Sequence, residues 1–388
     1  MNRTSENFNR ALQKFLDDNP DIDFEKAKNE FIELYNSGQY KLEDDFSKAE
    51  ELFENALELN DEKLVIDALR KAVAICPYHY EAKGELALLE SKTENDKINN
   101  LKAILDENKK YLEKEKEIDF NNFERTLWLN IDARSYLRNL FKLMMRYINN
   151  KNYDEGFIIS KELIKLDPEN HQDQKVFYLL ALLANKKYDD VLNKAIEYYK
   201  EEEHSKFLFL AFLASVYKKD DKLAIDYARK LAKLNISYLC LIVGVVNLEP
   251  EDYEDIFNNP YIALESFEDA ARVFFCLNQI IFENIDKLND FIDNYGQEVV
   301  SLIDPNHKGM ELLFIFVKER EKTLDALMQS IKAFDPKMDF AKLKSLSKDE
   351  IRKELIALKN KKYLEYYDNK YVLTYLGSSV LRFFVGEE

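Results

Sequence analysis

The histidines are the first residues to consider for metal binding or acid–base catalysis, and they lie far apart in this sequence. The chain contains four of them: His79, His171, His204 and His307. None has the close spacing of a metal-binding motif. Because metal ligands cluster in sequence motifs, we interpret these side chains as exposed or helix-capping groups.

Adjacent carboxylates occur at two places where they could support general acid–base catalysis. Asp189 and Asp190 form one pair, Asp220 and Asp221 the other, and each pair opens an expected helix. The helix dipole favours acidic residues there, which explains both pairs without catalysis. The sequence has no glycine-rich phosphate loop, nucleophile elbow or His-Glu metalloprotease helix. We therefore predict no enzyme activity and no cofactor; an enzyme would need a deep pocket with convergent polar groups.

A binding role is predicted from polar side chains on and near the first helices of expected helical hairpins. The candidates for a partner-binding surface are Arg134, Arg138, Asn170 and Gln172. Hydrogen bonding between repeats and helix capping are the alternative roles of these residues. Aromatic residues at helical spacing are expected in the core between neighbouring helices rather than in a groove: Phe207, Phe209 and Phe212.

The C-terminal region differs in charge from the rest of the chain. Residues 341–388 contain 10 Lys and Arg against 7 Asp and Glu, whereas the whole chain has a net charge of -17. Such a local change of sign suits a nucleic-acid-reading module on an acidic scaffold. The candidate nucleic-acid contacts are Lys348, Arg352, Lys353 and Lys359. Protein docking and capping of the helical array are the alternative roles of this region.

The composition indicates a folded and mostly helical protein. Its 388 residues include only 8 Gly and 7 Pro, so few residues interrupt helices. Charged residues make up 33% and hydrophobic residues 46% of the chain, which is typical of a soluble protein with a large core. The negative net charge disfavours nonspecific binding to nucleic acid, because the average surface repels phosphates.

The cysteines and the apolar segments indicate where the protein resides. Cys76, Cys240 and Cys276 are widely separated in apolar surroundings, so we expect buried thiols in a reducing compartment. The N-terminus lacks the apolar run of a signal peptide, and the longest apolar segments are about half as long as a membrane span requires. We expect a cytoplasmic protein that does not associate with membranes.

The middle of the chain contains repeated helical hairpins. Three are expected at residues 136–166, 173–199 and 206–234, after shorter amphipathic helices from residue 5 to residue 115. Their second helices begin at YDEG, YDDV and KDDKLA. The equivalent residues are spaced by 35 and then 33 positions, which indicates a modular array: Gly156, Val191 and Ala224.

This spacing resembles that of the tetratricopeptide-repeat family, whose period is about 34 residues. Gly156 falls where the family has a small residue, and Tyr147 falls on an aromatic position of the first helix. Residues 167–170, Asp-Pro-Glu-Asn, match the turn between units. Three positions depart from the family pattern by having larger residues: Met144, Leu163 and Val191.

A narrower resemblance covers about residues 45–245. The segments DARSYLRN, PENHQ and FYLL, at 132–139, 168–172 and 177–180, are similar to bacterial helical-repeat proteins grouped with the suppressor-of-tumorigenicity type. That resemblance implies a helical-repeat fold and no established enzymatic activity.

The tail has a different pattern. From Leu346 the sequence predicts a helix, then two short strands on either side of Asp368 and Asn369, and a final helix after Gly377. This order resembles the end of a winged-helix domain, which implies contact with DNA or docking to another protein.

The sequence therefore predicts an all-α fold, a right-handed α-α superhelix of tetratricopeptide-like hairpins with a small winged-helix-like α/β domain at the C-terminus. The expected regions are N-terminal helices at 1–44, the repeat array at 45–245, helices continuing the array at 246–334, and the C-terminal domain at 335–388. The predicted function is a non-enzymatic scaffold or adaptor that binds a protein or peptide on its concave surface. The alternative is a nucleic-acid-linked regulator, with DNA contact through the C-terminal domain and partner or peptide sensing by the repeats.

Overall fold

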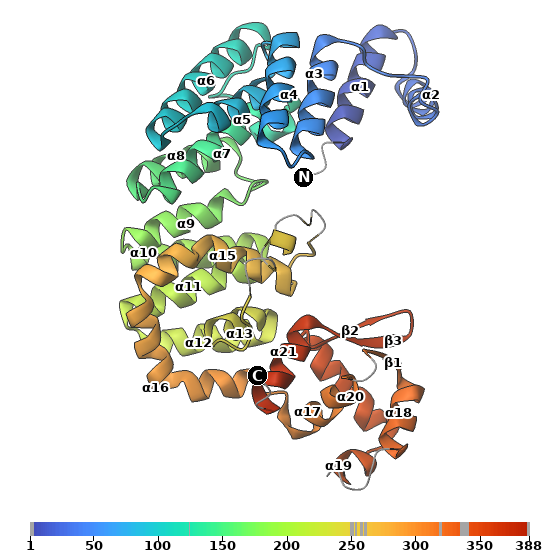
Figure 1. The fold of residues 1–388 in the computed structure, drawn as a ribbon, viewed down its shortest axis with the longest axis vertical. Helices are drawn as coiled ribbons and strands as arrows, with labels where there is room; N and C mark the ends of the chain where they lie inside the picture. Colours follow the sequence, from blue (N-terminus) through green and yellow to red (C-terminus); the bar gives the residue numbers. More distant parts are fainter. Residues whose placement is uncertain are drawn as a thin grey trace. The chain divides into compact units, whose positions relative to one another are not determined.

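The computed structural model is built almost entirely of helices, with a small sheet near the C-terminus (Figure 1). The structure describes residues 4–123, 125–248, 252, 254–256, 259, 262–317, 320–333 and 341–385. The chain divides into two compact units, unit 1 (Met1–Ala181) and unit 2 (Leu182–Glu388). The predicted fold class, an all-α array of hairpins with a small C-terminal α/β region, is confirmed. The four region boundaries expected from the sequence stay predictions.

Unit 1 is a series of helices in which neighbours along the chain pack together. Their bounds are α1 (Thr4–Asp18), α2 (Phe24–Asn36), α3 (Asp45–Leu57), α4 (Glu62–Ile75), α5 (Tyr80–Glu90), α6 (Glu94–Glu115), the 3-10 turns η1 (Leu127–Leu129) and η2 (Ile131–Ala133), α7 (Arg134–Asn149) and α8 (Tyr153–Leu166). Helix α9 (Gln174–Ala184) spans the boundary. α1 packs on α2, α3 on α4, α5 on α6 and α7 on α8. In addition α5 contacts α7 directly, which brings alternate helices together.

Helix starts in unit 1 are fixed by side chains that accept hydrogen bonds from exposed backbone N–H groups. Asp44 accepts from the backbone N of Ser47 at 2.7 Å, and Asp61 accepts from the backbone N of Lys63 at 2.8 Å. Thr93 caps α6 in the same way. Caps of this kind contribute about 1 kcal/mol each. Part of the acidic composition therefore has a structural role.

The predicted repeat period appears in the turns inside three hairpins. Lys151, Lys186 and Lys219 each adopt the left-handed conformation, with φ of 62°, 58° and 64°. These lysines are 35 and then 33 residues apart. Each precedes by five residues one of the equivalent positions from which the sequence predicts the repeat, so the two spacings agree. The three later residues are all buried: Gly156, Val191 and Ala224.

Unit 2 begins with hairpin helices and ends in a mixed α/β region. Its elements are α10 (Tyr188–Glu202), α11 (Ser205–Lys218), α12 (Asp221–Leu234), α13 (Ser237–Ile242), α15 (Phe267–Glu283), α16 (Ile285–Ile303), α17 (Asn306–Ile315), β1 (Glu321–Thr323), α18 (Leu324–Ala333), α19 (Ala341–Lys344), α20 (Lys348–Asn360), β2 (Leu364–Tyr367), β3 (Lys370–Leu373) and α21 (Tyr375–Val385). α10 packs on α11, and α11 on α12.

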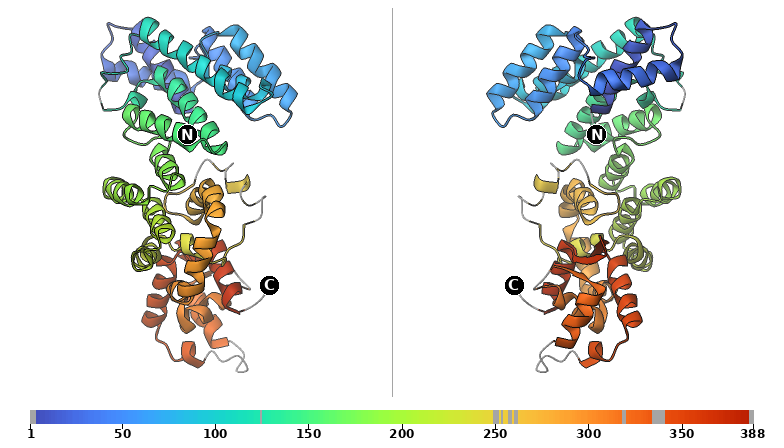
Figure 2. Two further views of the ribbon diagram at one scale, coloured as in Figure 1. Left: turned by 90° about the vertical axis from the view of Figure 1, so that its left-hand side faces the viewer. Right: turned by 90° about the vertical axis from the view of Figure 1, so that its right-hand side faces the viewer.

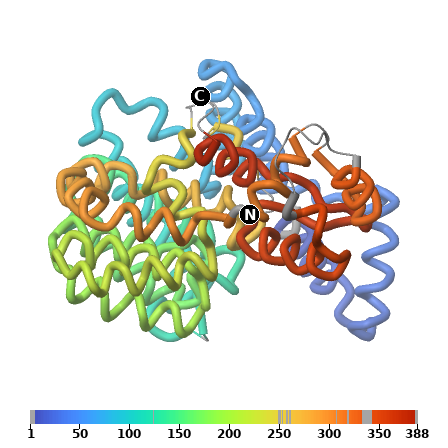
Figure 3. The backbone as a smooth tube through the Cα atoms, turned by 90° about the horizontal axis from the view of Figure 1, so that it is seen from below, coloured from blue at the N-terminus to red at the C-terminus, as the bar shows by residue number. Residues whose placement is uncertain are grey.

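Helix α11 is the centre of unit 2. Every residue from Ser205 to Tyr217 is buried, because α10 and α12 flank the helix and α16 packs against both α11 and α12 (Figure 3). Phe209 stacks against a ring from α15 with centroids 6.2 Å apart, and Phe212 contacts a ring from α16 edge-to-face with centroids 5.6 Å apart. The prediction that the aromatic residues of this helix form core is confirmed.

The C-terminal sheet is antiparallel with strand order β1-β3-β2 (Figure 1). Figure 2 shows the C-terminal region, coloured orange to red, from two further sides. Leu364 pairs with Leu373 across the β2–β3 hairpin, whose turn residues Asp368 and Asn369 have φ of 48° and 61°. The two strands predicted around these residues are confirmed. The third strand, β1, was not predicted, and it lies before the expected boundary at residue 335.

Two side chains just before the β2–β3 hairpin form hydrogen bonds with the end of α16. The Lys361 ammonium donates to the backbone oxygens of Leu302 at 3.1 Å and Asp304 at 2.6 Å. The Tyr363 hydroxyl donates to the oxygen of Ile303 at 2.5 Å, and burial raises the pKa of this phenol well above its ordinary value. A cation and a hydroxyl therefore satisfy the last carbonyls of α16.

Cys76 and Cys240 are buried free thiols, as predicted, whereas Cys276 is partly exposed. No helix in the described ranges combines the length and apolar character that crossing a bilayer requires.

Candidate partner-binding site

Unit 1 contains a polar cavity of about 240 Å³ among side chains from α1, α3, α5, α6 and α7. Five polar lining residues are each less than 9% exposed: Glu6, Glu50, His79, Glu81 and Asn108. Burial of charged groups is costly unless they are paired. Their concentration around one cavity makes it the candidate functional site.

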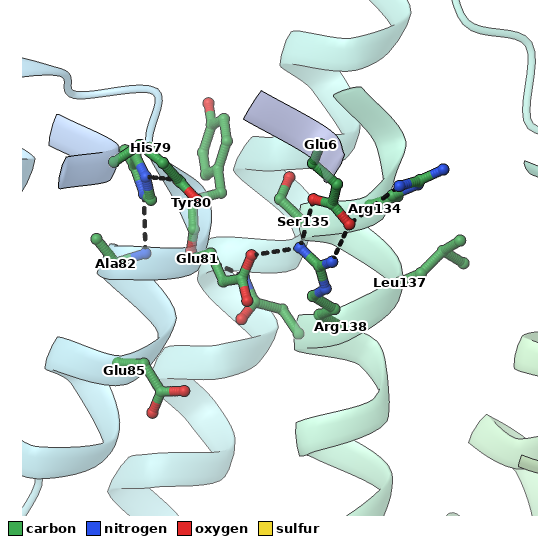
Figure 4. Close-up of polar contacts among 12 residues, drawn as sticks. Glu6, His79, Tyr80, Glu81, Ala82, Glu85, Arg134, Ser135, Leu137 and Arg138 are labelled. Atoms are coloured by element: carbon green, nitrogen blue, oxygen red, sulfur yellow. Dashed lines mark hydrogen bonds and ion pairs between the residues drawn. The ribbon is translucent and has the colours of Figure 1, made fainter. Parts of the chain in front are cut away.

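Two arginines one turn apart on α7, Arg134 and Arg138, which we call the arginine pair, bind the same carboxylate; Arg138 lines the polar cavity, whereas Arg134 does not. Figure 4 shows both side chains converging on the carboxylate of Glu6 from α1. Nη1 of Arg134 donates to Oε1 of Glu6 at 3.0 Å, and Nη1 of Arg138 donates to Oε2 of Glu6 at 3.2 Å. Nη2 of Arg138 also donates to Glu6, and its Nη1 donates to Oε2 of Glu81 at 3.0 Å.

Arg138 stays charged although its side chain is largely buried. Burial alone would lower the pKa of Arg138, but Glu81 and Glu6 outweigh that effect and raise its pKa above the ordinary value of arginine. A buried guanidinium that cannot lose its proton requires an anionic partner. Glu6 and Glu81 supply that negative charge to Arg138 from within the chain.

An aromatic platform orients the arginine pair. The guanidinium carbons of Arg134 and Arg138 lie 5.3 and 5.4 Å from the centroid of the Trp128 ring. Nε of Arg134 donates to the backbone oxygen of Trp128 at 2.8 Å. The imidazole of His171 stacks on the Trp128 ring, with the two ring centroids 5.3 Å apart and an angle of 9° between the ring planes. The pair is consequently held in place by stacking as well as by charge.

The predicted turn at residues 167–170 supports this platform. Asp167 is fully buried and accepts hydrogen bonds from Oγ1 of Thr126 at 2.8 Å and from the backbone N of His171 at 2.9 Å. Its Oδ1 lies 2.8 Å from Nδ1 of His171, and its Oδ2 accepts from Nε2 of Gln174 at 3.0 Å. Asp167 thus fixes the imidazole beneath Trp128.

The other two predicted partner contacts are engaged within the chain. Oδ1 of Asn170 accepts from the backbone N of Lys175 at 3.0 Å, and Nε2 of Gln172 donates to the backbone oxygen of Leu137 at 3.2 Å. Neither residue lines the polar cavity. The structure therefore brings Arg134 and Arg138 together and gives Asn170 and Gln172 the alternative capping and bridging roles, while their contact with a partner stays a prediction.

Asn108, on α6, offers the cavity an acceptor. Its Nδ2 donates to Oγ of Ser135 at 3.2 Å, and no donor among the described residues reaches its Oδ1. The side chain is fully buried, and a buried carbonyl without a donor costs about 1–3 kcal/mol. Close by along the cavity wall, the rings of Tyr78 and Tyr111 stack with centroids 4.6 Å apart. The cavity thus combines an acceptor, the guanidinium of Arg138 and aromatic surface.

The histidine in the cavity caps a helix and contacts a carboxylate. Nδ1 of His79 accepts from the backbone N of Ala82 at 3.1 Å, so we place the ring proton on Nε2, which lies 2.6 Å from Oε2 of Glu50. Both ring nitrogens are then occupied. Burial raises the pKa of the neighbouring Cys76 thiol, which opposes its use as a nucleophile. These groups suit binding better than proton transfer.

Several site residues were not predicted from the sequence. Glu6, Glu50 and Asn108 occupy ordinary positions of amphipathic helices, and nothing in their spacing marks them. His79 was interpreted as an exposed or capping group; it caps α5 but is only 1% exposed. The four-residue spacing of the arginine pair was the one signal of a shared surface.

The predicted nucleic-acid contacts lie together on the exposed side of α20 in unit 2. The ammonium of Lys348 lies 2.5 Å from the carboxylate of Asp325, and a guanidinium nitrogen of Arg352 lies 3.6 Å from that of Asp349. Lys353 and Lys359 are exposed on the same helix.

No protein-family model matches this chain, and no curated protein matches it either. In the described part of the chain, no group of three or more His, Cys, Asp or Glu side chains is placed to hold a metal ion.

Proposed function

We propose that the protein is a non-enzymatic, tetratricopeptide-like scaffold that binds a partner peptide at the polar cavity of unit 1. The observation that carries the proposal is the buried acceptor of Asn108, which lines the same cavity as the guanidinium of Arg138. A polypeptide offers both complementary groups, since it has backbone N–H donors and can carry a carboxylate. Helical arrays bind extended peptides and partner helices by such surfaces.

The size of the cavity supports a segment of a larger partner rather than a free small molecule. Small-molecule pockets usually enclose about 300–1,000 Å³. The polar cavity has about 240 Å³, room for one or two side chains. Tyr78 is half exposed beside it, and an exposed aromatic ring gives a partner apolar contact area.

Selection of random displayed peptides on the full-length protein tests this function. We expect a shared motif, and we expect Asn108→Leu to weaken the selected peptides by about tenfold, because a peptide N–H loses its acceptor. Asn99→Leu, at an exposed position of the same helix, is the matched control and should leave affinity unchanged. Enrichment without any common motif, or equal affinity of both variants, would count against a peptide site in this cavity.

A second candidate function is contact with nucleic acid through the C-terminal region. The order α17, β1, α18, α19, α20, β2, β3 resembles that of a winged helix with one additional short helix, and four exposed basic residues lie on α20. Nucleic-acid contact ranks second as a function because the positive charge on α20 is partly neutralised. Lys348 and Arg352 are ion-paired with aspartates, and α20 also carries Glu350 and Glu354.

Fluorescence anisotropy with duplex DNA at low salt tests the second function. If α20 contacts phosphates, the double variant Lys353→Glu and Lys359→Glu should weaken binding by at least tenfold and flatten its salt dependence. Unchanged binding in the double variant, or none by the wild-type protein, would remove this candidate.

A further inference from the structure

The α1–α2 hairpin has a hydrophobic core of its own. Its buried members are Ala11, Phe15, Ala27 and Phe31. The rings of Phe8 and Phe31 lie 5.1 Å apart across the hairpin. A separate cluster, which includes Phe53 and Leu69, fills helices α3 to α5. The apolar face of α1 is therefore directed at α2.

Helix α1 contacts the part of unit 1 outside the α1–α2 hairpin through polar side chains on one of its faces. Besides the bonds from Glu6 to the arginine pair, Nδ2 of Asn7 donates to Oε1 of Glu54 at 3.1 Å. Arg10 lies one turn after Glu6; its Nη2 is 3.4 Å from Oδ1 of Asp132, and its guanidinium carbon is 4.1 Å from the centroid of the Phe46 ring. This face thus presents a carboxylate and, four residues later, a guanidinium.

The ion pairs between Glu6 and the arginine pair can be replaced by ion pairs with a carboxylate of another molecule. The arginine pair needs an anion because removal of one partner from a buried ion pair is strongly destabilising. Replacement of Glu6 by another carboxylate leaves the pair satisfied, so the exchange changes the free energy little. The hairpin keeps its own core in either state. A partner with the same polar pattern and additional contacts at the cavity would displace α1.

We propose that α1 is an internal occupant of the partner site, and that the partner carries a helix with a carboxylate followed one turn later by an arginine or lysine. This inference rests on the proposed function, since it names what the partner presents to the arginine pair. Glu6 and Arg10 of α1 are such a carboxylate and arginine, and both make their contacts at the partner site. Binding of the partner and docking of α1 are then mutually exclusive.

A synthetic peptide with the sequence of α1, TSENFNRALQKFLDD, is the probe for this competition. Trp128 is the single tryptophan of the chain and contacts the arginine pair, so its fluorescence reports occupancy. The wild-type protein should bind the peptide weakly, because its own α1 fills the site. The full-length Glu6→Gln variant should bind it at least tenfold more tightly, because the internal competitor lacks the charge.

Three controls make the outcome decisive. The peptide with Gln in place of Glu6 should not bind any chain. Arg10→Gln, which weakens docking of α1 but leaves the arginine pair intact, should also increase peptide affinity. Glu25→Gln, at an exposed position of α2, should behave as the wild type. Equal peptide affinity for all chains, or no binding to any of them while the Trp128 emission remains that of the folded protein, would overturn the inference.

The result is separable from that of the proposed function. If selected foreign peptides bind the wild-type and Glu6→Gln proteins equally well, α1 is not a competitor although the scaffold function stands. If the α1 peptide binds the Glu6→Gln variant but selection yields no foreign motif, the internal occupancy stands and the scaffold function falls.

Discussion

Gly377→Ala should destabilise the C-terminal α/β region by about 3 kcal/mol. A Cβ at Gly377 would lie 2.1 Å from the backbone oxygen of Tyr363 and 3.0 Å from Cδ1 of Leu373. The oxygen of Tyr363 also accepts from Oγ1 of Thr374 at 3.0 Å, so it cannot move away without losing a hydrogen bond. Either α21 or the start of β2 must shift.

Hydrogen exchange measured by mass spectrometry checks this prediction region by region. We expect amides of β3 and α21 to exchange about a hundredfold faster in the variant, while peptides from unit 1 serve as the internal reference. Gly296→Ala in α16 is the matched control, since its added Cβ would lie 3.3 Å from Cγ2 of Ile292 and requires that side chain to move by only a few tenths of an ångström. Exchange in the C-terminal region that matches this control would show that α21 does not pack as described.

Gly84→Ala should destabilise unit 1 by about 2 to 3 kcal/mol and impair the binding site. An alanine Cβ would lie 2.2 Å from Oδ1 of Asn139, where α5 and α7 approach closely. Asn139 is fully buried, and its Nδ2 donates to the backbone oxygen of Tyr80 at 2.8 Å. The added methyl group must break that bond or separate the helices that carry Glu81 and Arg138.

Urea unfolding followed by Trp128 fluorescence measures the effect in unit 1 specifically, because the chain has no second tryptophan. The double variant Gly84→Ala and Asn139→Ala provides the test of mechanism. If the clash is the cause, the double variant should lose less stability than the sum of the single variants, by about 1 kcal/mol or more. Strict additivity would place the cause elsewhere.

The helical fold was predictable because its signal is local. Apolar periodicity, acidic helix caps and scarce glycine recur along the chain, and the spacing of Gly156, Val191 and Ala224 reappears in the turns. Gly156 itself is close to α7, since a Cβ there would lie 2.9 Å from Cγ1 of Ile148. Local patterns of this kind survive folding because they do not depend on distant partners.

Packing of α15 and α16 was less predictable, although one signal existed. Helix α16 packs against both α11 and α12, and the order of helices along the chain does not give these contacts. The segment FLFLAFLASVY in α11 is apolar on nearly all sides, and such a helix must be covered on all sides. That requirement could have been inferred from the sequence.

The arrangement of the candidate site was only partly predictable from the sequence, for a physical reason. Arg134 and Arg138 share a helix face, so their proximity follows from helix geometry. Their anion, Glu6, comes from a helix more than 120 positions earlier, and its pairing is decided by tertiary packing. Strand β1 was missed for the same reason, since it pairs with β3 about 50 residues later.

Nuclear magnetic resonance of the arginine side chains tests most directly whether the arginine pair is where a partner binds. The Nε–H of Arg134 is hydrogen-bonded to the oxygen of Trp128, which favours observation of its signal. We predict that titration with a selected peptide shifts the Nε–H resonances of Arg134 and Arg138, and that a peptide lacking its carboxylate does not. A peptide that binds the protein tightly while both resonances stay unchanged would contradict this account.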